Sequence, residues 1–170
     1  MSNVANKAGE PRATAESIMC EIVSLNAGFQ DIRATWGRRM AISGAQLSTM
    51  TAIAVLDRGG GVSVKETASR MRVGPSFITL CTKPLEKKGF LRRRMSPADA
   101  RVILMSLTES SSDLVAAILD EQLALCRSIF ADFDDQELDR FARILRGANT
   151  ELSRKRCRSA PLHLASRHGK

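Results

Sequence analysis

The sequence predicts a mainly α-helical fold with one small β-hairpin, and three observations lead to this prediction. Hydrophobic residues make up 44% of the 170 residues but aromatic residues only 4%, a balance typical of aliphatic helical cores. Apolar residues recur at alternating steps of four and three near both ends of the chain, which indicates amphipathic helices. Between them, residues 63–108 predict a capped helix, a tight turn, a second helix and a basic hairpin. This succession is typical of a winged helix-turn-helix, in which one helix enters a DNA major groove.

The first helix is predicted over residues 13–37. It follows a small, polar N-terminal segment, residues 1–12, which we expect to be disordered. A narrow apolar stripe runs along the helix and consists of Ile18, Ile22, Leu25, Phe29, Ile32 and Trp36. Because such a stripe requires a partner helix, we expect this segment to take part in dimerisation.

Serine residues followed three positions later by Gln or Glu mark the starts of the next two helices. Ser43 with Gln46 opens one helix, and Ser63 with Glu66 opens another over residues 64–71. In this capping box the hydroxyl accepts from a free backbone amide, and the Gln or Glu side chain accepts from the backbone of the serine. Both helices are therefore expected to begin directly after the serine.

The second helix of the helix-turn-helix is predicted to begin at Pro75, after a turn at Gly74, and to stop at Gly89. Pro84 lies in the interior of this helix and removes the hydrogen bond to the Leu80 carbonyl. Such a proline costs about 3 kcal/mol unless packing compensates. We therefore expect the helix to be bent or loosened there.

A hairpin and two further helices follow. Strands are expected at residues 90–94 and 102–107, joined by a proline-containing turn. A long apolar-rich helix should run from residue 108 to about residue 131. The last helix is opened by Asp134, with Glu137 completing a capping box.

These elements predict one domain over residues 13–155, with a disordered basic tail at residues 156–170. The winged helix occupies residues 42–107. Helices within residues 13–37 and 108–155 are the expected dimerisation elements, since each terminal region carries an apolar stripe.

The net charge of +8 is distributed unevenly along the chain. Residues 63–107 carry a charge of +7 and residues 146–170 a charge of +6, whereas residues 108–145 carry −6. The acidic helical region would repel phosphates, while the winged segment would attract them. A polyanion is therefore expected to meet one end of the molecule.

The sequence does not predict an enzyme, a metalloprotein or a membrane protein. It has no Gly-rich phosphate loop, and His163 and His168 lack further ligands at metal-binding spacing. We accordingly expect no catalysis, no cofactor and no metal. No apolar run reaches the roughly 18 residues that a membrane span requires, no signal peptide is recognisable and no C-x-x-C pair occurs, so we predict a cytoplasmic protein.

Five motifs identify a family resemblance when they are taken together. They read Ile42-Ser43-x-x-Gln46, Val64-x-Glu66-x-Ala68, Leu85-Glu86-Lys87-Lys88-Gly89-Phe90, Asp99-x-Arg101 and Leu107-Thr108-Glu109. Over about residues 14–155 the chain resembles the MarR (multiple antibiotic resistance regulator) family of bacterial transcription factors. The resemblance implies a homodimer that binds double-stranded DNA at a pseudo-palindromic operator, often under the control of a small-molecule effector.

Candidate base-reading residues lie near the start of the helix that opens at Pro75. Ser76, Phe77 and Thr79 are placed to reach base edges, and Lys83 could reach a base or a phosphate. Two alternatives stay open for Phe77: contact with a thymine methyl group, or inward packing in the core.

Candidate backbone contacts lie on the wing. Arg92, Arg93 and Arg94 on its first strand would neutralise phosphates or enter a narrow minor groove. The family resemblance implies that Arg101 enters the minor groove and that Asp99 orients it. A run of arginines can also simply keep an edge strand solvated, but the neighbouring helix-turn-helix favours DNA contact here.

We expect none of the four cysteines to act as an oxidant sensor. Cys157 lies among cations that favour a reactive thiolate, yet we expect a free thiol on a disordered tail with no sensing role. Small buried packing is the commoner fate of Cys20, Cys81 and Cys126, which lie in helical segments.

The functional prediction is a homodimeric, sequence-specific transcriptional regulator, a repressor relieved by a small ligand. Two alternatives remain from the sequence alone. One is a winged-helix module that binds a protein partner, and the other is a non-specific nucleic-acid packaging protein, which the basic tail would suit.

Overall fold

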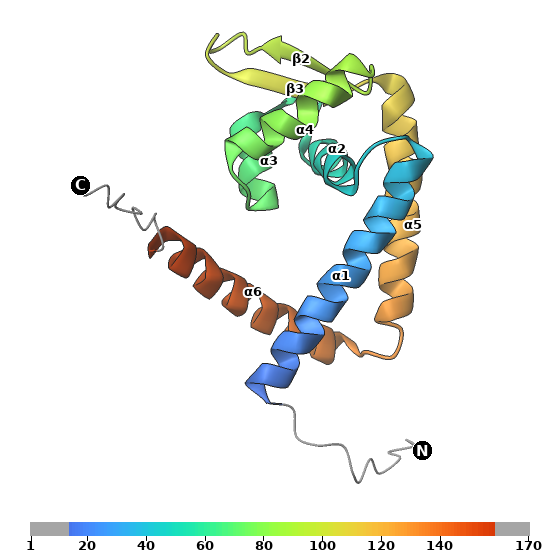
Figure 1. Cartoon of the computed structure of the whole chain (residues 1–170), viewed down its shortest axis with the longest axis vertical. Helices are drawn as coiled ribbons and strands as arrows, with labels where there is room; N and C mark the ends of the chain where they lie inside the picture. Colours follow the sequence, from blue (N-terminus) through green and yellow to red (C-terminus); the bar gives the residue numbers. More distant parts are fainter. Residues whose placement is uncertain (1–13, 159–170) are drawn as a thin grey trace, which may run out of the picture. The chain divides into compact units, whose positions relative to one another are not determined.

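The computed structural model describes residues 14–158 and is mainly helical, with one small antiparallel sheet (Figure 1). The chain divides into two compact units, residues 1–120 and 121–170. In chain order the elements are α1 (Ala15–Arg39), α2 (Gly44–Leu56), β1 (Val62–Ser63), α3 (Val64–Met71), α4 (Pro75–Lys87), β2 (Leu91–Met95), β3 (Ile103–Leu107), α5 (Glu109–Ile129) and α6 (Asp135–Arg158). The predicted fold class is confirmed.

The predicted capping boxes set the helix starts. At α2, Ser43 Oγ accepts from the Gln46 amide at 3.1 Å while Gln46 Oε1 accepts from the Ser43 amide at 2.9 Å. Ser63 makes the same exchange with Glu66 at α3. The cap at the start of α1, Thr14, was not predicted; its partner three residues on is a serine rather than Glu or Gln.

The sheet has the strand order β1-β3-β2, and both pairings are antiparallel. The wing strands β2 and β3 begin one residue later than predicted, with Leu91 opposite Leu107 and Met95 opposite Ile103. β1 was missed, because it has only two residues, the second of which is the N-cap of α3, and so carries no alternating pattern. Its Val62 pairs with Met105, so that β1 covers the edge of β3 that β2 leaves unpaired.

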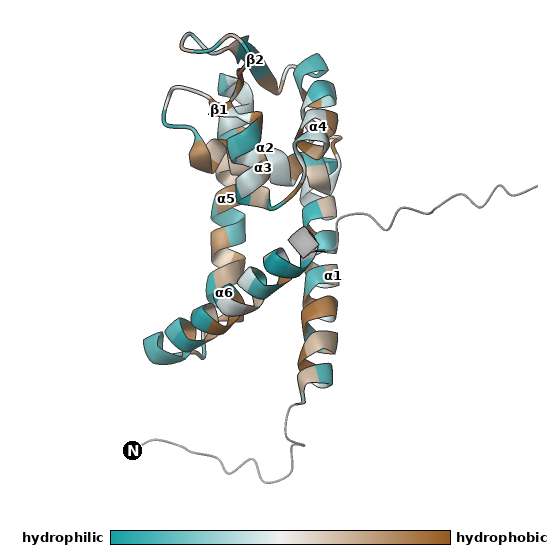
Figure 2. Ribbon diagram, turned by 90° about the vertical axis from the view of Figure 1, so that its left-hand side faces the viewer, coloured by the Kyte–Doolittle hydropathy of each residue, from teal (hydrophilic) through white to brown (hydrophobic). Residues whose placement is uncertain are grey.

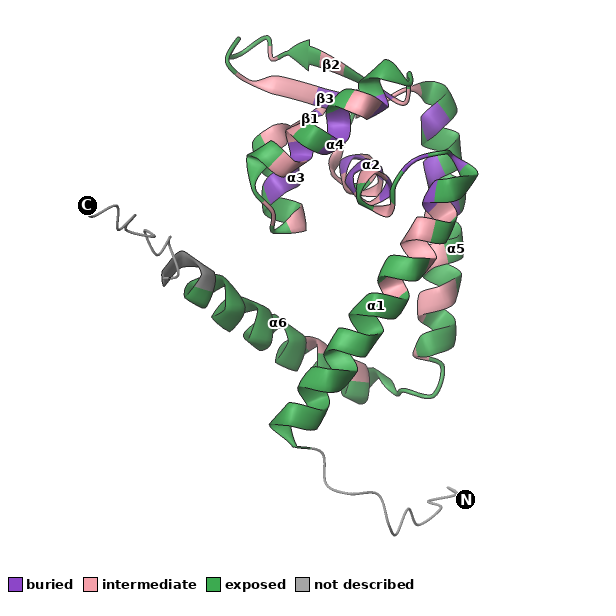
Figure 3. Ribbon diagram, in the orientation of Figure 1, coloured by how far each residue is buried: buried purple, intermediate pink, exposed green. Residues whose placement is uncertain are grey.

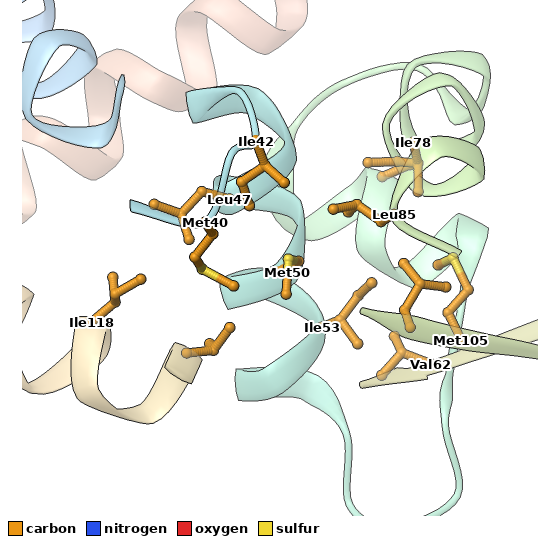
Figure 4. Close-up of a cluster of buried hydrophobic side chains, with 13 residues drawn as sticks. Met40, Ile42, Leu47, Met50, Ile53, Val62, Ile78, Leu85, Met105 and Ile118 are labelled. Atoms are coloured by element: carbon orange, nitrogen blue, oxygen red, sulfur yellow. The ribbon is translucent and has the colours of Figure 1, made fainter. Parts of the chain in front are cut away.

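The core of the first unit centres on α2 (Figure 4). Leu47, Met50 and Ile53 are at most 1% exposed. Buried side chains from the other elements surround them: Ile78 and Leu85 on α4, Val62 and Met105 in the sheet, and Val115 and Ile118 on α5. The aliphatic core predicted from composition is confirmed, and it holds α4 and the wing together.

α1 and α2 cross at a point where their backbones almost touch. A Cβ atom on Gly37 would lie 2.6 Å from the Ile42 carbonyl oxygen, and one on Gly44 would lie 3.2 Å from the Ala34 nitrogen. Trp36, the last residue of the apolar stripe, packs against the core beside this crossing. The 2.6 Å approach at Gly37 requires glycine, and the 3.2 Å approach at Gly44 leaves little room for a methyl group.

The second unit contains the end of α5 and the whole of α6. Phe130 contacts Phe133 and Phe141, with ring centroids 5.7 and 6.1 Å apart. The capping box of Asp134 and Glu137 is present, with distances of 2.8 and 3.0 Å.

The end of α6 corrects the boundary of the predicted tail. The helix continues through Arg158, so residues 156–158, which we expected in the aperiodic tail, are helical. A helical repeat is hard to recognise where nearly every residue is basic or polar. The other tail residues, together with residues 1–12, lie outside the described part of the chain.

Candidate nucleic-acid interface

α4 presents one apolar face to the core and one exposed face to solvent. It buries Ile78, Cys81, Thr82 and Leu85, while Ser76, Leu80, Lys83 and Lys87 are exposed. These exposed positions recur every three or four residues and therefore lie on one surface of the helix. The helix runs without interruption through Pro84, which is half-buried.

The predicted polar readers take different positions on this helix. Ser76 and Lys83 are exposed, and Thr79 is half-buried. Thr79 Oγ1 donates to the Pro75 carbonyl at 3.2 Å. Its proton is thus used within the helix, which leaves the oxygen lone pairs as the group that Thr79 can offer to a base.

Phe77 packs inward. Its ring is half-buried and lies against the hydrophobic core of the first unit. This is the second of the two arrangements considered for Phe77, and it leaves only part of the ring facing outward.

The three wing arginines do not form one surface, because successive side chains of a strand point to opposite faces. Arg92 and Arg94 are exposed. Arg93 lies on the same face as the buried Leu91; its side chain is only 18% exposed, and its Nη1 is 4.0 Å from Glu86 Oε2 on α4. Arg93 therefore connects the wing to α4.

Arg94 also fixes a neighbouring loop. Its Nη2 donates to the Gly60 carbonyl at 2.8 Å. In the same loop, Asp57 Oδ1 accepts from the amides of Gly59 and Gly61 at 2.8 Å each. Gly61 has a φ of +76°, a conformation that glycine adopts without strain.

The turn of the wing places Arg101. Asp99 Oδ1 accepts from the Arg101 backbone amide at 2.9 Å, and the Asp99 carbonyl accepts from the Val102 amide at 2.9 Å. Arg101 is exposed. The hydrogen bond is to the backbone of Arg101. Asp99 therefore orients the Arg101 side chain only through the backbone that carries it.

Two contacts that the sequence analysis missed hold this surface in place. Ser111 is fully buried on α5, and its Oγ donates to the Phe90 carbonyl. At the end of α4, Lys88 Nζ donates to the carbonyl of Ala41, which has a φ of 53°. Neither is a local pattern: the partners lie 21 and 47 residues apart in sequence.

The thiols in the described helices differ in exposure. Cys81 is buried as expected, and burial raises the pKa of its thiol while a hydrogen bond with the Thr49 side chain opposes that shift. Cys126 is half-buried, whereas Cys20 is exposed on α1, contrary to the expectation. The side chain of Cys157 and both histidines, His163 and His168, lie outside the described residues.

Among the side chains that the structure describes, those of residues 14–155, no group of three or more His, Cys, Asp or Glu is arranged to hold a metal ion. No helix in the same range has the length and apolar character needed to cross a bilayer.

Comparison with known proteins gives the same family as the sequence motifs and the winged helix-turn-helix fold. Residues 45–103 match the MarR family. The chain is 30% identical to an HTH-type transcriptional repressor of Bacillus subtilis, MdtR, over 77% of this chain and 85% of that protein.

Solved structures share the fold. The Staphylococcus aureus MepR–DNA complex matches with a TM-score of 0.69 and 15% identity, covering 82% of this chain and 99% of that one. CouR from Rhodococcus jostii bound to p-coumaroyl-CoA matches with a TM-score of 0.68 and 19% identity, covering 81% and 95%. By fold, family motif and sequence identity, the chain belongs to the MarR family of winged helix-turn-helix transcriptional regulators, which bind DNA and are not enzymes.

Proposed function

We propose that the protein is a homodimeric repressor that binds a pseudo-palindromic operator and is released from it by a small ligand. In this proposal Ser76, Thr79 and Lys83 face the major groove, while Arg92, Arg94 and Arg101 contact the backbone or the minor groove. Phe77 and Arg93 contribute mainly by holding α4 and the wing in position. The operator is genomic DNA, so the protein would act in the bacterial cytoplasm.

The observation that carries the proposal is that α4 and the neighbouring wing both expose cations. The exposed side of α4 and the solvent side of β2 both carry cations, and Lys83, Lys87, Arg92 and Arg94 are all exposed. One rigid core holds both elements. Cations spaced over two elements suit a helix in the major groove and a wing on the adjacent backbone.

The homodimer is supported by the apolar side chains that α1 leaves exposed, visible as brown segments in Figure 2. Ile18, Ile22 and Leu25 are 49%, 41% and 50% exposed. In α6, which is drawn almost entirely as exposed in Figure 3, Ile144 and Leu152 are 60% and 59% exposed. Apolar surfaces of this extent favour association.

The proposals of repression and of control by a ligand are supported by two similar proteins. The Bacillus protein is named as a repressor, and the Rhodococcus protein was solved with an acyl-coenzyme A ligand. A ligand that binds one conformation of the dimer better than the other would shift DNA affinity by that difference. The chemical identity of the ligand is left to a screen against the protein–operator complex.

The test is binding at physiological salt to a duplex from the upstream region of the protein's own gene and to a scrambled duplex of equal length. We expect a preference of about a thousandfold or more for the upstream duplex. Equal binding that weakens steeply with salt would contradict specificity and favour packaging, because packaging depends on counterion release. Absence of binding to either duplex would favour a protein partner.

A further inference from the structure

Leu80 occupies the centre of the exposed face of α4. Its side chain is 72% exposed, the largest exposed fraction among the large apolar side chains of the described residues. Other apolar residues of this helix face the core: Ile78 and Leu85 are fully buried and Cys81 is 6% exposed. Leu80 is therefore not a displaced core residue.

The exposed neighbours of Leu80 on α4 are polar or basic, whereas Phe77 and Pro84, its other neighbours at helical spacing, are half-buried. Ser76 lies four residues before it and Lys83 three residues after it, so all three share one surface of the helix. Lys87 continues that surface, and Arg92 and Arg94 are exposed on the adjacent wing. This concentration of cations favours a polyanion over a protein as the occupant.

We propose that Leu80 is a specificity-determining residue that contacts the C5-methyl group of a thymine in the major groove. The inference rests on the proposed DNA-binding function and deepens it. In the major groove only thymine presents a methyl group, and apolar side chains distinguish it from cytosine and from the purines. The hydroxyls of Ser76 and Thr79 can bond to several bases, so Leu80 supplies a preference that they lack.

Phe77 does not compete for this role. Its half-buried ring is packed against the core, whereas Leu80 projects from the same helix with nearly three quarters of its side chain exposed. An apolar side chain with few intramolecular contacts gives up little packing when it contacts a base. The contact is favourable because it removes the apolar surfaces of the side chain and of the thymine methyl group from water.

The test uses a duplex selected by the wild-type protein from a random-sequence pool. Each thymine of that duplex is replaced in turn by uracil, which removes the methyl group and keeps base pairing. At one thymine per half-site we expect wild-type affinity to fall about fourfold, the effect of losing one buried methyl group. The Leu80→Ala protein should bind the thymine and uracil duplexes within about twofold of each other.

Val55→Ala is the matched control. Val55 is an exposed apolar residue, 51% exposed, but it lies on α2. We expect this variant to keep the full sensitivity to uracil. Circular dichroism checks that Leu80→Ala folds, as the exposure of the side chain predicts.

The outcomes distinguish failure of the Leu80–thymine contact from failure of the proposed DNA-binding function. Uracil sensitivity that is lost only in Leu80→Ala supports the contact. If the wild type selects a sequence but uracil affects it and Leu80→Ala equally, or affects neither, Leu80 does not read thymine although the protein is sequence-specific. If the wild type selects no sequence, the proposed function fails and this inference fails with it. Loss of binding to a partner protein in Leu80→Ala, with DNA affinity unchanged, would also overturn it.

Discussion

Adjacent arginines of the wing differ in exposure and in their contacts, and composition alone could not predict this difference. Arg92 and Arg94 are exposed, whereas Arg93 is largely covered and lies beside Glu86. The period-2 alternation of a strand produces this division once the strand boundaries are known. Assigning all three to phosphate contact, as the sequence suggested, therefore overlooks the link that Arg93 makes to α4.

Salt dependence should distinguish these arginines. Arg92→Ala should lower the slope of log affinity against log salt by about one per subunit, since in the proposed interface it removes a phosphate contact. Arg93→Ala serves as the neighbouring control and should leave the slope nearly unchanged. The assignment fails if Arg93→Ala and Arg92→Ala lower the slope equally. Fluorescence anisotropy over a range of salt concentrations provides the measurement.

The cap of α3 should make stability depend on pH. Hydrogen bonds from the Ser63 side chain and backbone hold the pKa of Glu66 below its ordinary value of 4.5. Because the folded-state pKa is the lower one, the stabilisation is complete above the ordinary value and is lost as pH falls through the folded value.

Urea unfolding at about pH 7 and about pH 3.5 tests this cap. Part of the loss of stability in acid should be absent from Glu66→Gln, which keeps a hydrogen-bond acceptor but cannot be protonated. An identical loss of stability in the wild type and in Glu66→Gln would show that this carboxylate does not contribute.

At the scale of elements, the features that local sequence controls were predicted well. The caps at Ser43, Ser63 and Asp134 act within three residues, so sequence alone locates them. Features that depend on distant partners were not: β1 exists only through its pairing with β3, and Phe77 turns inward because the core accepts its ring.

The crossing of α1 and α2 is another feature that the sequence did not reveal, and it leads to a prediction. Gly37→Ala should lower the free energy of unfolding by about 1–3 kcal/mol, because the new methyl group meets the Ile42 carbonyl and backbone must shift. Gly28, on the same helix, has nothing within 4 Å of the position that a Cβ atom would take, so Gly28→Ala should be neutral or stabilising by up to about 1 kcal/mol.

Denaturant unfolding of both variants measures this difference. Equal stability of Gly37→Ala and the wild type would mean that the two helices can separate at the crossing without cost.

For the whole molecule, the proposed dimer depends on the apolar side chains that α1 leaves exposed. Ile22→Asp places a charge on that stripe and should weaken self-association, because burying an unpaired carboxylate is costly. Glu21→Gln changes a neighbouring exposed residue and should leave association intact. Sedimentation velocity distinguishes the species, and a wild-type monomer at micromolar concentration would remove the argument for a palindromic operator.

Selection of bound duplexes from a random-sequence pool is the most direct test of the central claim, that a dimer of winged helices reads specific DNA. We expect enrichment of an inverted repeat whose half-sites lie one helical turn apart, about 10 base pairs from centre to centre. Recovery of no common sequence, or of a single site without a repeat, would contradict the claim.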